Sequence, residues 1–196
     1  HGTGTATITA MQSGDGDWNA ATAVEQELLV QTRPLAVTPA AGQSKVFGTA
    51  DPVFAYEHGG AVEGETPSFT GSLLRAEGEA VGNYAITQDS LALADNGAFL
   101  AANYTMAFTG GVTFAITAKD AAALTIAAIG PVTYNGTAHC PEPEVRDGDI
   151  LLVKGVDYSL SYAANTNVGT ATVTVGGKGN YNGTQDTTFA INTAAL

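Results

Sequence analysis

A short pattern recurs along the chain: an alternating Thr-rich strand, a turn in which an aromatic residue follows Asp or Asn, and a second strand. One match sets residues 5–9 (TATIT) against residues 170–174 (TATVT), and a second, after a gap of two residues, sets Asp17-Trp18-Asn19 against Asn180-Tyr181-Asn182. A middle copy retains Asn103-Tyr104-Thr105. Self-similarity of this kind is the signature of an array of similar structural units. The sequence therefore predicts a tandem arrangement of strand-built modules.

The composition indicates that these modules are β-rich. The chain contains 24 glycines and only 13% charged residues, against about 25% in an average domain. Short alternating segments are separated by Gly, Asn and Asp turn signals, and no segment shows sustained helical periodicity with caps. We therefore expect an all-β protein built from tandem Ig-like β-sandwich modules, with an N-terminal partial module that consists of a hairpin.

Three domains are expected, with boundaries at residues 1–32, 33–118 and 119–196. Residues 1–32 contain only two strands, and a lone hairpin is marginal in water. We interpret them as the C-terminal hairpin of a truncated Ig-like module. Its exposed edges could pair with another copy, so a strand-swapped or edge-paired dimer is a possible assembly. Thr32-Arg33-Pro34 forms a stiff junction, because proline restricts its own backbone and that of the residue before it.

Two of these segments resemble known families. Residues 42–52 (GQSKVFGTADP), 71–79 (GSLLRAEGE) and 81–86 (VGNYAI) resemble the MBG-type repeats of bacterial surface proteins. Residues 134–138 (YNGTA) and 179–184 (GNYNGT) are similar to a related bacterial Ig-like repeat. The resemblance implies an MBG-like β-sandwich at 33–118, a bacterial Ig-like β-sandwich at 119–196, and a secreted or cell-surface adhesin-like parent protein. It brings no catalytic residues.

Charge and hydropathy exclude several classes of partner. The formal net charge is -12, which repels phosphate backbones and disfavours nucleic acid. The longest apolar run, residues 121–132, is shorter than the roughly 20 residues that a membrane-spanning helix needs. No nucleophile elbow, phosphate-binding loop or spaced set of metal ligands is present in the sequence, so we expect no enzyme, no cofactor and no membrane span.

Two acidic turns are the candidate metal sites. Asp15 with Asp17, and Asp147 with Asp149, could donate oxygens to calcium. The alternative is an ordinary turn, for which Asp and Gly are favoured by their backbone behaviour. A calcium site needs about six or more oxygen ligands, and each turn supplies two carboxylates. The sequence favours the turn and leaves calcium as the less favoured interpretation.

Three aromatic residues, Trp18, Tyr104 and Tyr181, occupy matched positions in the repeats. An exposed ring could stack on a sugar. Recurrence at matched positions instead favours a shared packing role, similar to the tyrosine corner of Ig-like folds. We expect all three to be buried at corners of the fold.

The segment at residues 88–101 (QDSLALADNGAFLA) is longer than its counterpart in the third module. It ends in the apolar pair Phe99-Leu100, which are the candidate ligand-binding residues. The alternative is that the segment packs over an open edge of its own module, which would also account for its length.

Two functions remain open from the sequence. The first is a structural stalk or spacer that contacts neighbouring Ig-like modules of the same protein. The second is an adhesive module that binds a glycan or a host matrix protein through loops or an edge strand.

Overall fold

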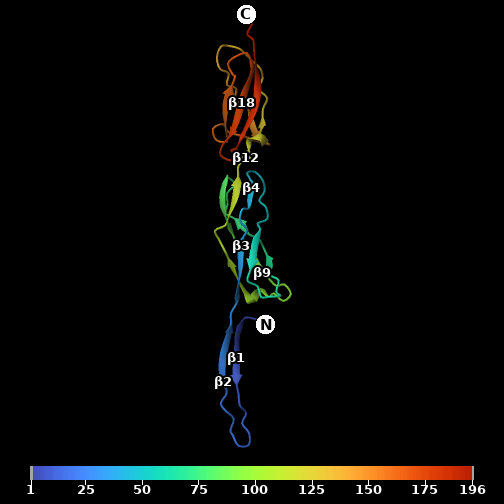
Figure 1. Cartoon of the computed structure of the whole chain (residues 1–196), viewed down its shortest axis with the longest axis vertical. Coiled ribbons are helices and arrows are strands. Elements are labelled where there is room, and N and C mark those ends of the chain that lie inside the picture. The colour runs from blue at the N-terminus through green and yellow to red at the C-terminus, as the bar shows by residue number, and fades with distance from the viewer. Residues whose placement is uncertain (1, 196) are drawn as a thin grey trace. The chain divides into compact units, whose positions relative to one another are not determined.

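The computed structural model describes residues 2–195, and these residues form an all-β protein (Figure 1). Its only helical elements among the described residues are two single 3-10 turns, η1 (Ala101–Asn103) and η2 (Ala121–Ala123). None of the helical segments in residues 2–195 has the length and apolar character needed to cross a membrane. The expected all-β fold class is confirmed and its sheets are consistent with β-sandwich packing, whereas the tandem arrangement of Ig-like modules remains a prediction.

The chain divides into two compact units whose segments alternate along the sequence. Unit 1 contains the chain up to Ala41 together with Val53–Ala76 and Ala85–Thr113. Unit 2 contains Gly42–Pro52, Glu77–Tyr84 and the chain from Phe114 onward. The chain therefore passes several times from one unit to the other, and each unit is described by itself below. The expected domain boundaries remain a prediction.

Unit 1 begins with an isolated hairpin, drawn in blue in Figure 1. Strand β1 (Gly4–Ala10) pairs antiparallel with β2 (Val24–Val30), in a register that runs from Gly4 opposite Val30 to Ala10 opposite Val24. Every residue of both strands is exposed. The two strands form a sheet of their own, as the sequence predicts.

The rest of unit 1 is built around β3 (Arg33–Pro39). This strand lies between β10 (Tyr104–Phe108), to which it is parallel, and β5 (Tyr56–Gly59), to which it is antiparallel. Because side chains alternate along a strand, Leu35 and Val37 point to one face, and both are fully buried. Two smaller pairings complete the unit: β6 (Ser68–Thr70) with β9 (Ala92–Ala94), and β7 (Leu74–Arg75) with the end of β8 (Gly82–Thr87).

Unit 2 contains two short parallel pairings near its start. Strand β4 (Ser44–Val46) pairs with β11 (Thr113–Thr117), and β12 (Lys119–Asp120) pairs with β19 (Tyr181–Asn182). Residues 119–192 of unit 2, which include β12 and β19, are called the C-terminal segment below.

The C-terminal segment contains two sheets that share a core. The larger sheet has the order β14-β20-β18-β17, and its strands are β14 (Val132–Thr133), β20 (Thr184–Asn192), β18 (Gly169–Gly177) and β17 (Tyr158–Ala163). The smaller sheet has the order β13-β15-β16, and its strands are β13 (Thr125–Ile126), β15 (Val145–Asp147) and β16 (Ile150–Leu151). Val145 of the smaller sheet packs in one buried cluster with Val175 and Tyr158 of the larger sheet. Packing of two sheet faces on one core is the architecture of a β-sandwich.

Candidate functional site

The matched aromatic residues have two different environments. Tyr104 is 6% exposed and Tyr181 is 5% exposed, whereas Trp18 is 75% exposed. The prediction of a buried corner is therefore confirmed for the two tyrosines, called the corner tyrosines below, and is wrong for Trp18. Trp18 lies in the turn of the isolated hairpin, where no second layer covers it.

Tyr181 is held by a basic residue and a carboxylate in unit 2. Its hydroxyl donates to Asp147 Oδ2 at 3.2 Å, and Lys119 Nζ lies 2.5 Å from Asp147 Oδ1. Lys119 is also the residue paired with Tyr181 in the parallel β12-β19 bridge. Burial is the main reason that the pKa of Tyr181 rises to about 12, and the neighbouring Asp147 carboxylate raises it further.

Tyr104 has a matching set of partners in unit 1. Its hydroxyl donates to Glu65 Oε2 at 2.6 Å and accepts a hydrogen bond from the Val62 backbone at 3.0 Å. Arg33 is paired with Tyr104 across the parallel β3-β10 bridge. The hydrogen bond to Glu65 raises the pKa of the Tyr104 hydroxyl, because it stabilises the protonated form. Each corner tyrosine thus donates its hydroxyl to a carboxylate, and its backbone pairs with a basic residue in the parallel strand at the start of the repeat.

The recurring pattern in the sequence identified the tyrosines and missed their partners. Glu65 and Asp147 are far from the tyrosines in sequence and lie in segments with no shared motif. The sequence does contain one feature that points to the basic partners. Arg33 and Lys119 each follow shortly after a predicted strand that ends an earlier repeat, so they occupy matched positions.

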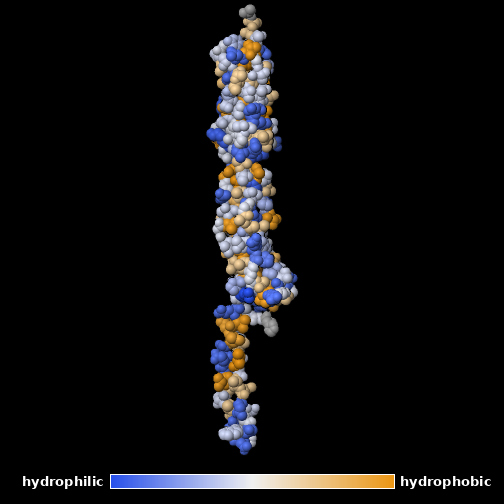
Figure 2. Space-filling view, in the orientation of Figure 1, coloured by the Kyte–Doolittle hydropathy of each residue, from blue (hydrophilic) through white to orange (hydrophobic). Residues whose placement is uncertain are grey.

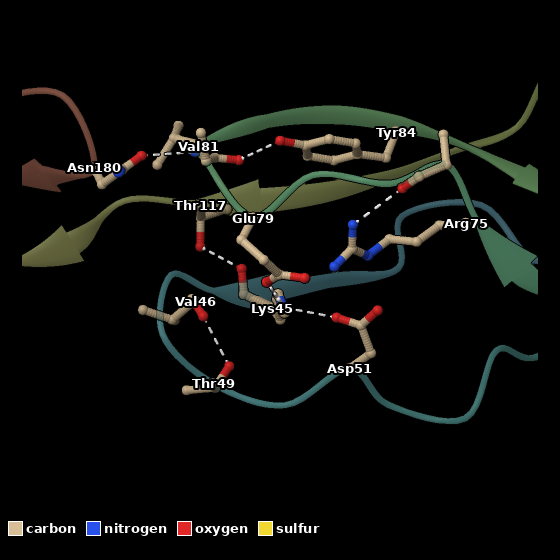
Figure 3. Close-up of polar contacts among 12 residues, drawn as sticks. Lys45, Val46, Thr49, Asp51, Arg75, Glu79, Val81, Tyr84, Thr117 and Asn180 are labelled. Carbon is tan, nitrogen blue, oxygen red and sulfur yellow. Dashed lines mark hydrogen bonds and ion pairs between the residues drawn. The ribbon is translucent and has the colours of Figure 1, made fainter.

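A second cluster of polar side chains in unit 2 connects two segments, Gly42–Pro52 and Glu77–Tyr84, through a lysine (Figure 3). These two segments are called the clamped loops below. Lys45 is 8% exposed, and its Nζ lies 2.7 Å from Asp51 Oδ1 and 2.5 Å from Glu79 Oε2. The hydrogen bonds to Asp51 and Glu79 raise the pKa of Lys45, since they stabilise the ammonium form. We call Lys45, Asp51 and Glu79 the lysine clamp. It ties Gly42–Pro52 to Glu77–Tyr84.

Both clamped loops contact the turn of the C-terminal segment that contains Tyr181. The ring of Phe47 meets the Tyr181 ring edge-on, with centroids 5.6 Å apart at an interplanar angle of 77°. The Val81 backbone N–H donates to Asn180 Oδ1 at 2.9 Å, a bond drawn in Figure 3. Phe47 is also partly buried against the core cluster of the C-terminal segment. Aromatic and hydrogen-bonded contacts thus fix both loops on one turn.

The predicted calcium residues make other interactions. Asp15 Oδ1 accepts hydrogen bonds from the backbone N–H groups of Asp17 at 2.9 Å and Trp18 at 3.0 Å, which is the geometry of a turn-stabilising Asp. Asp147 is bound by Lys119 and Tyr181, as described above, and the Asp149 carbonyl accepts from Arg146. Within residues 2–195, no three His, Cys, Asp or Glu side chains come together in a group that could hold a metal ion.

The predicted ligand residues, Phe99 and Leu100, differ in exposure. Phe99 is 0% exposed, and its ring stacks on Tyr104 with centroids 4.6 Å apart, so this side chain supports the fold and is not presented to a ligand. Leu100 is 39% exposed. Residues 88–101 also contribute β9, which pairs with β6. The packing alternative for this segment therefore describes Phe99 better than the binding interpretation.

Unit 1 also contains a cleft of about 370 Å³ beside Tyr104. Its lining includes Arg33, Val62, Glu65 and Asn103, together with Val30 and Gln31 at the end of the hairpin. The cleft mixes charged, amide and apolar groups.

Comparison with known families confirms one of the resemblances. Residues 35–115 match the family model described as MBG domain (YGX type), in agreement with the resemblance of this segment to MBG-type repeats. The family is a structural repeat domain found in surface proteins, and it is not an enzyme family. A search of curated proteins found no match to the chain.

Proposed function

We propose that the chain supplies structural stalk repeats of a bacterial cell-surface, adhesin-like protein. In this role the chain spaces and orients other parts of the protein. The MBG-type repeat supports a surface location, and the strong negative charge is compatible with a solvated array.

The observation that carries this proposal is the packing of the clamped loops on the turn around Tyr181. Both loops lie within the stretch that matches the MBG model, and they form one compact unit with the C-terminal segment. A spacer transmits orientation only if successive repeats are fixed to one another. The Phe47–Tyr181 ring contact and the Val81–Asn180 hydrogen bond supply such a fixed connection.

Small-angle X-ray scattering on the 196-residue chain tests the proposal. We expect scattering from a restricted set of conformations, and a broader distribution of interatomic distances in the double variant Phe47→Ala, Asn180→Ala. Val53→Ala is the matched control, because Val53 is 92% exposed and should leave the profile unchanged. A wild-type profile that already fits freely jointed bodies would overturn the stalk proposal.

A second candidate function is adhesion to a glycan or a host matrix protein, and the cleft beside Tyr104 favours it. Its mixture of Arg33, Glu65, amide and apolar groups suits a polar ligand with a hydrophobic face. Titration of glycan arrays and matrix proteins tests this function, with Gln31→Arg at the rim of the cleft as the variant. Saturable binding that this variant weakens supports adhesion, and binding that it leaves unchanged removes the cleft from consideration.

A further inference from the structure

The isolated hairpin has one apolar face that is open to solvent. Ile8 is 57% exposed, Leu28 is 51% exposed and Val30 is 43% exposed. Ala6 lies opposite Leu28 in the register, so these four side chains share one face of the two strands. We call Ala6, Ile8, Leu28 and Val30 the open face. Figure 2 shows apolar side chains gathered over this hairpin.

The hairpin has the same register as β18 and β20 of the C-terminal segment. Gly4 pairs with Val30 and Ala6 with Leu28, as Gly169 pairs with Ile191 and Ala171 with Phe189. The four positions that match the open face are Ala171, Val173, Phe189 and Ile191, which are all buried in one core cluster. The same kind of strand pair therefore contributes its apolar face to a buried core in the C-terminal segment and leaves that face exposed in the hairpin.

Two local features strengthen the match. Gly4 has a φ of 137° and Gly169 a φ of 140°, so a glycine with the same unusual backbone begins each first strand. Thr9 lies opposite Glu25, as Thr174 lies opposite Asp186, to which its hydroxyl donates at 2.6 Å. Both the apolar and the polar face of the hairpin are thus repeated in β18 and β20.

The C-terminal segment shows what covers such a face. Its buried cluster is packed against the partly buried residues Ile129, Val132, Leu160 and Tyr162. At the sheet edges, β14 adds parallel to β20 and β17 adds antiparallel to β18. All these covering residues precede β18 in the chain.

We propose that the open face is one half of a β-sandwich core, and that β-strands similar to those formed by residues 124–163 cover it. The same protein supplies these strands, ahead of β1. A parallel strand would add at the free edge of β2, and an antiparallel strand at the free edge of β1. Trp18, which matches Tyr181, would become buried at the corner of the completed sandwich. This inference concerns the hairpin alone and does not depend on the stalk proposal.

Charge disfavours a second copy of the hairpin as the occupant. Strand β2 contains Glu25 and Glu27, and the turn contains Asp15 and Asp17, with no Lys or Arg from residue 2 to residue 32. Pairing two such hairpins edge to edge brings like charges together, which is destabilising. A second hairpin would also offer no aromatic residue in the place of Tyr162.

The test places a copy of residues 119–168 directly ahead of Gly4 in the full chain. Trp18 is the only tryptophan, so its fluorescence reports on this corner alone. We expect its emission to shift to shorter wavelength, its quenching by iodide to fall, and the amide protection of β1 and β2 to rise at least about tenfold. The control is the same fusion with Ile8→Asp and Leu28→Asp, which should abolish all three changes. A folded fusion with Trp18 still exposed overturns the proposal.

A second arrangement decides the question if the fusion does not fold. In a Trp18→Phe background, Gly4–Val30 of the unaltered sequence replaces Gly169–Ile191, so that the transplanted hairpin meets strands that are already present. A folded chimera with its single tryptophan protected supports the proposal, and an unfolded C-terminal segment overturns it. In the unmodified chain, light scattering should give a monomer with exposed Trp18. A dimer that Ile8→Asp dissociates would show instead that a second copy occupies the open face.

Discussion

Replacing Phe99 with Ala should destabilise unit 1 strongly. The side chain is 0% exposed, and its ring stacks on Tyr104 at 4.6 Å, so the substitution removes a fully buried ring and leaves a cavity. Substitutions of this kind cost about 3–5 kcal/mol, and loss of the stacked pair places the value toward the upper end. Total stabilities of about 5–15 kcal/mol make this a large fraction.

The neighbouring residue provides a matched control. Leu100 is 39% exposed, so Leu100→Ala should cost less than about 1.5 kcal/mol. Urea denaturation should be followed by hydrogen exchange in peptides from β3 and β10, which report on unit 1 separately from unit 2. Equal losses for the two variants, or a loss below about 1 kcal/mol for Phe99→Ala, would refute the assignment of Phe99 to the core.

Three further substitutions test the other contacts. Tyr181→Phe removes the hydrogen bond to Asp147 and should cost about 1–2 kcal/mol at neutral pH. Because the folded-state pKa of Tyr181 is raised to about 12 from 10.0, the wild-type advantage should be complete below pH 10 and shrink as the pH rises toward 12, which alkaline denaturation curves would show. Lys45→Met removes the ammonium group that contacts Asp51 and Glu79, so unit 2 should lose stability. Since the pKa of Lys45 is raised above 10.5, this loss should be full below pH 10.5 and decrease as the pH passes through the folded-state pKa; a constant loss at all pH values would contradict the ion pairing. Gly71→Ala places a Cβ 2.1 Å from a backbone carbonyl oxygen at a φ of 75°, so calorimetry should show a lower melting temperature for unit 1, and an unchanged one would show that the turn relaxes freely.

The sequence predicts which segments form strands better than it predicts which segments and side chains contact one another. Alternation of apolar residues indicates strands, because burial on one sheet face imposes a period of two, as the buried residues Ala171, Val173 and Val175 of β18 show. The sequence does not predict the short strand β9, since residues 88–101 are longer than their counterpart in the C-terminal segment and offer no repeat to align with it.

The polar constellations depend on tertiary contacts that no local pattern encodes. Lys45 and Glu79 are far apart in sequence, and they meet only because two loops fold onto one turn. Trp18 shows that a repeat pattern can also predict burial wrongly when the tertiary partner is missing. Its position in the repeat predicts burial, but burial requires a second sheet, and the isolated hairpin has none.

The parallel pairings described above have a mechanical consequence. In the C-terminal segment, β14 near the start is hydrogen-bonded in parallel to β20 at the end, and in unit 1 β3 is likewise parallel to β10. When a chain is pulled at its two ends, paired strands of this kind are drawn past each other along their length. The load then falls on several hydrogen bonds at once, whereas antiparallel end strands would be opened one bond at a time. The strand order therefore favours resistance to tension.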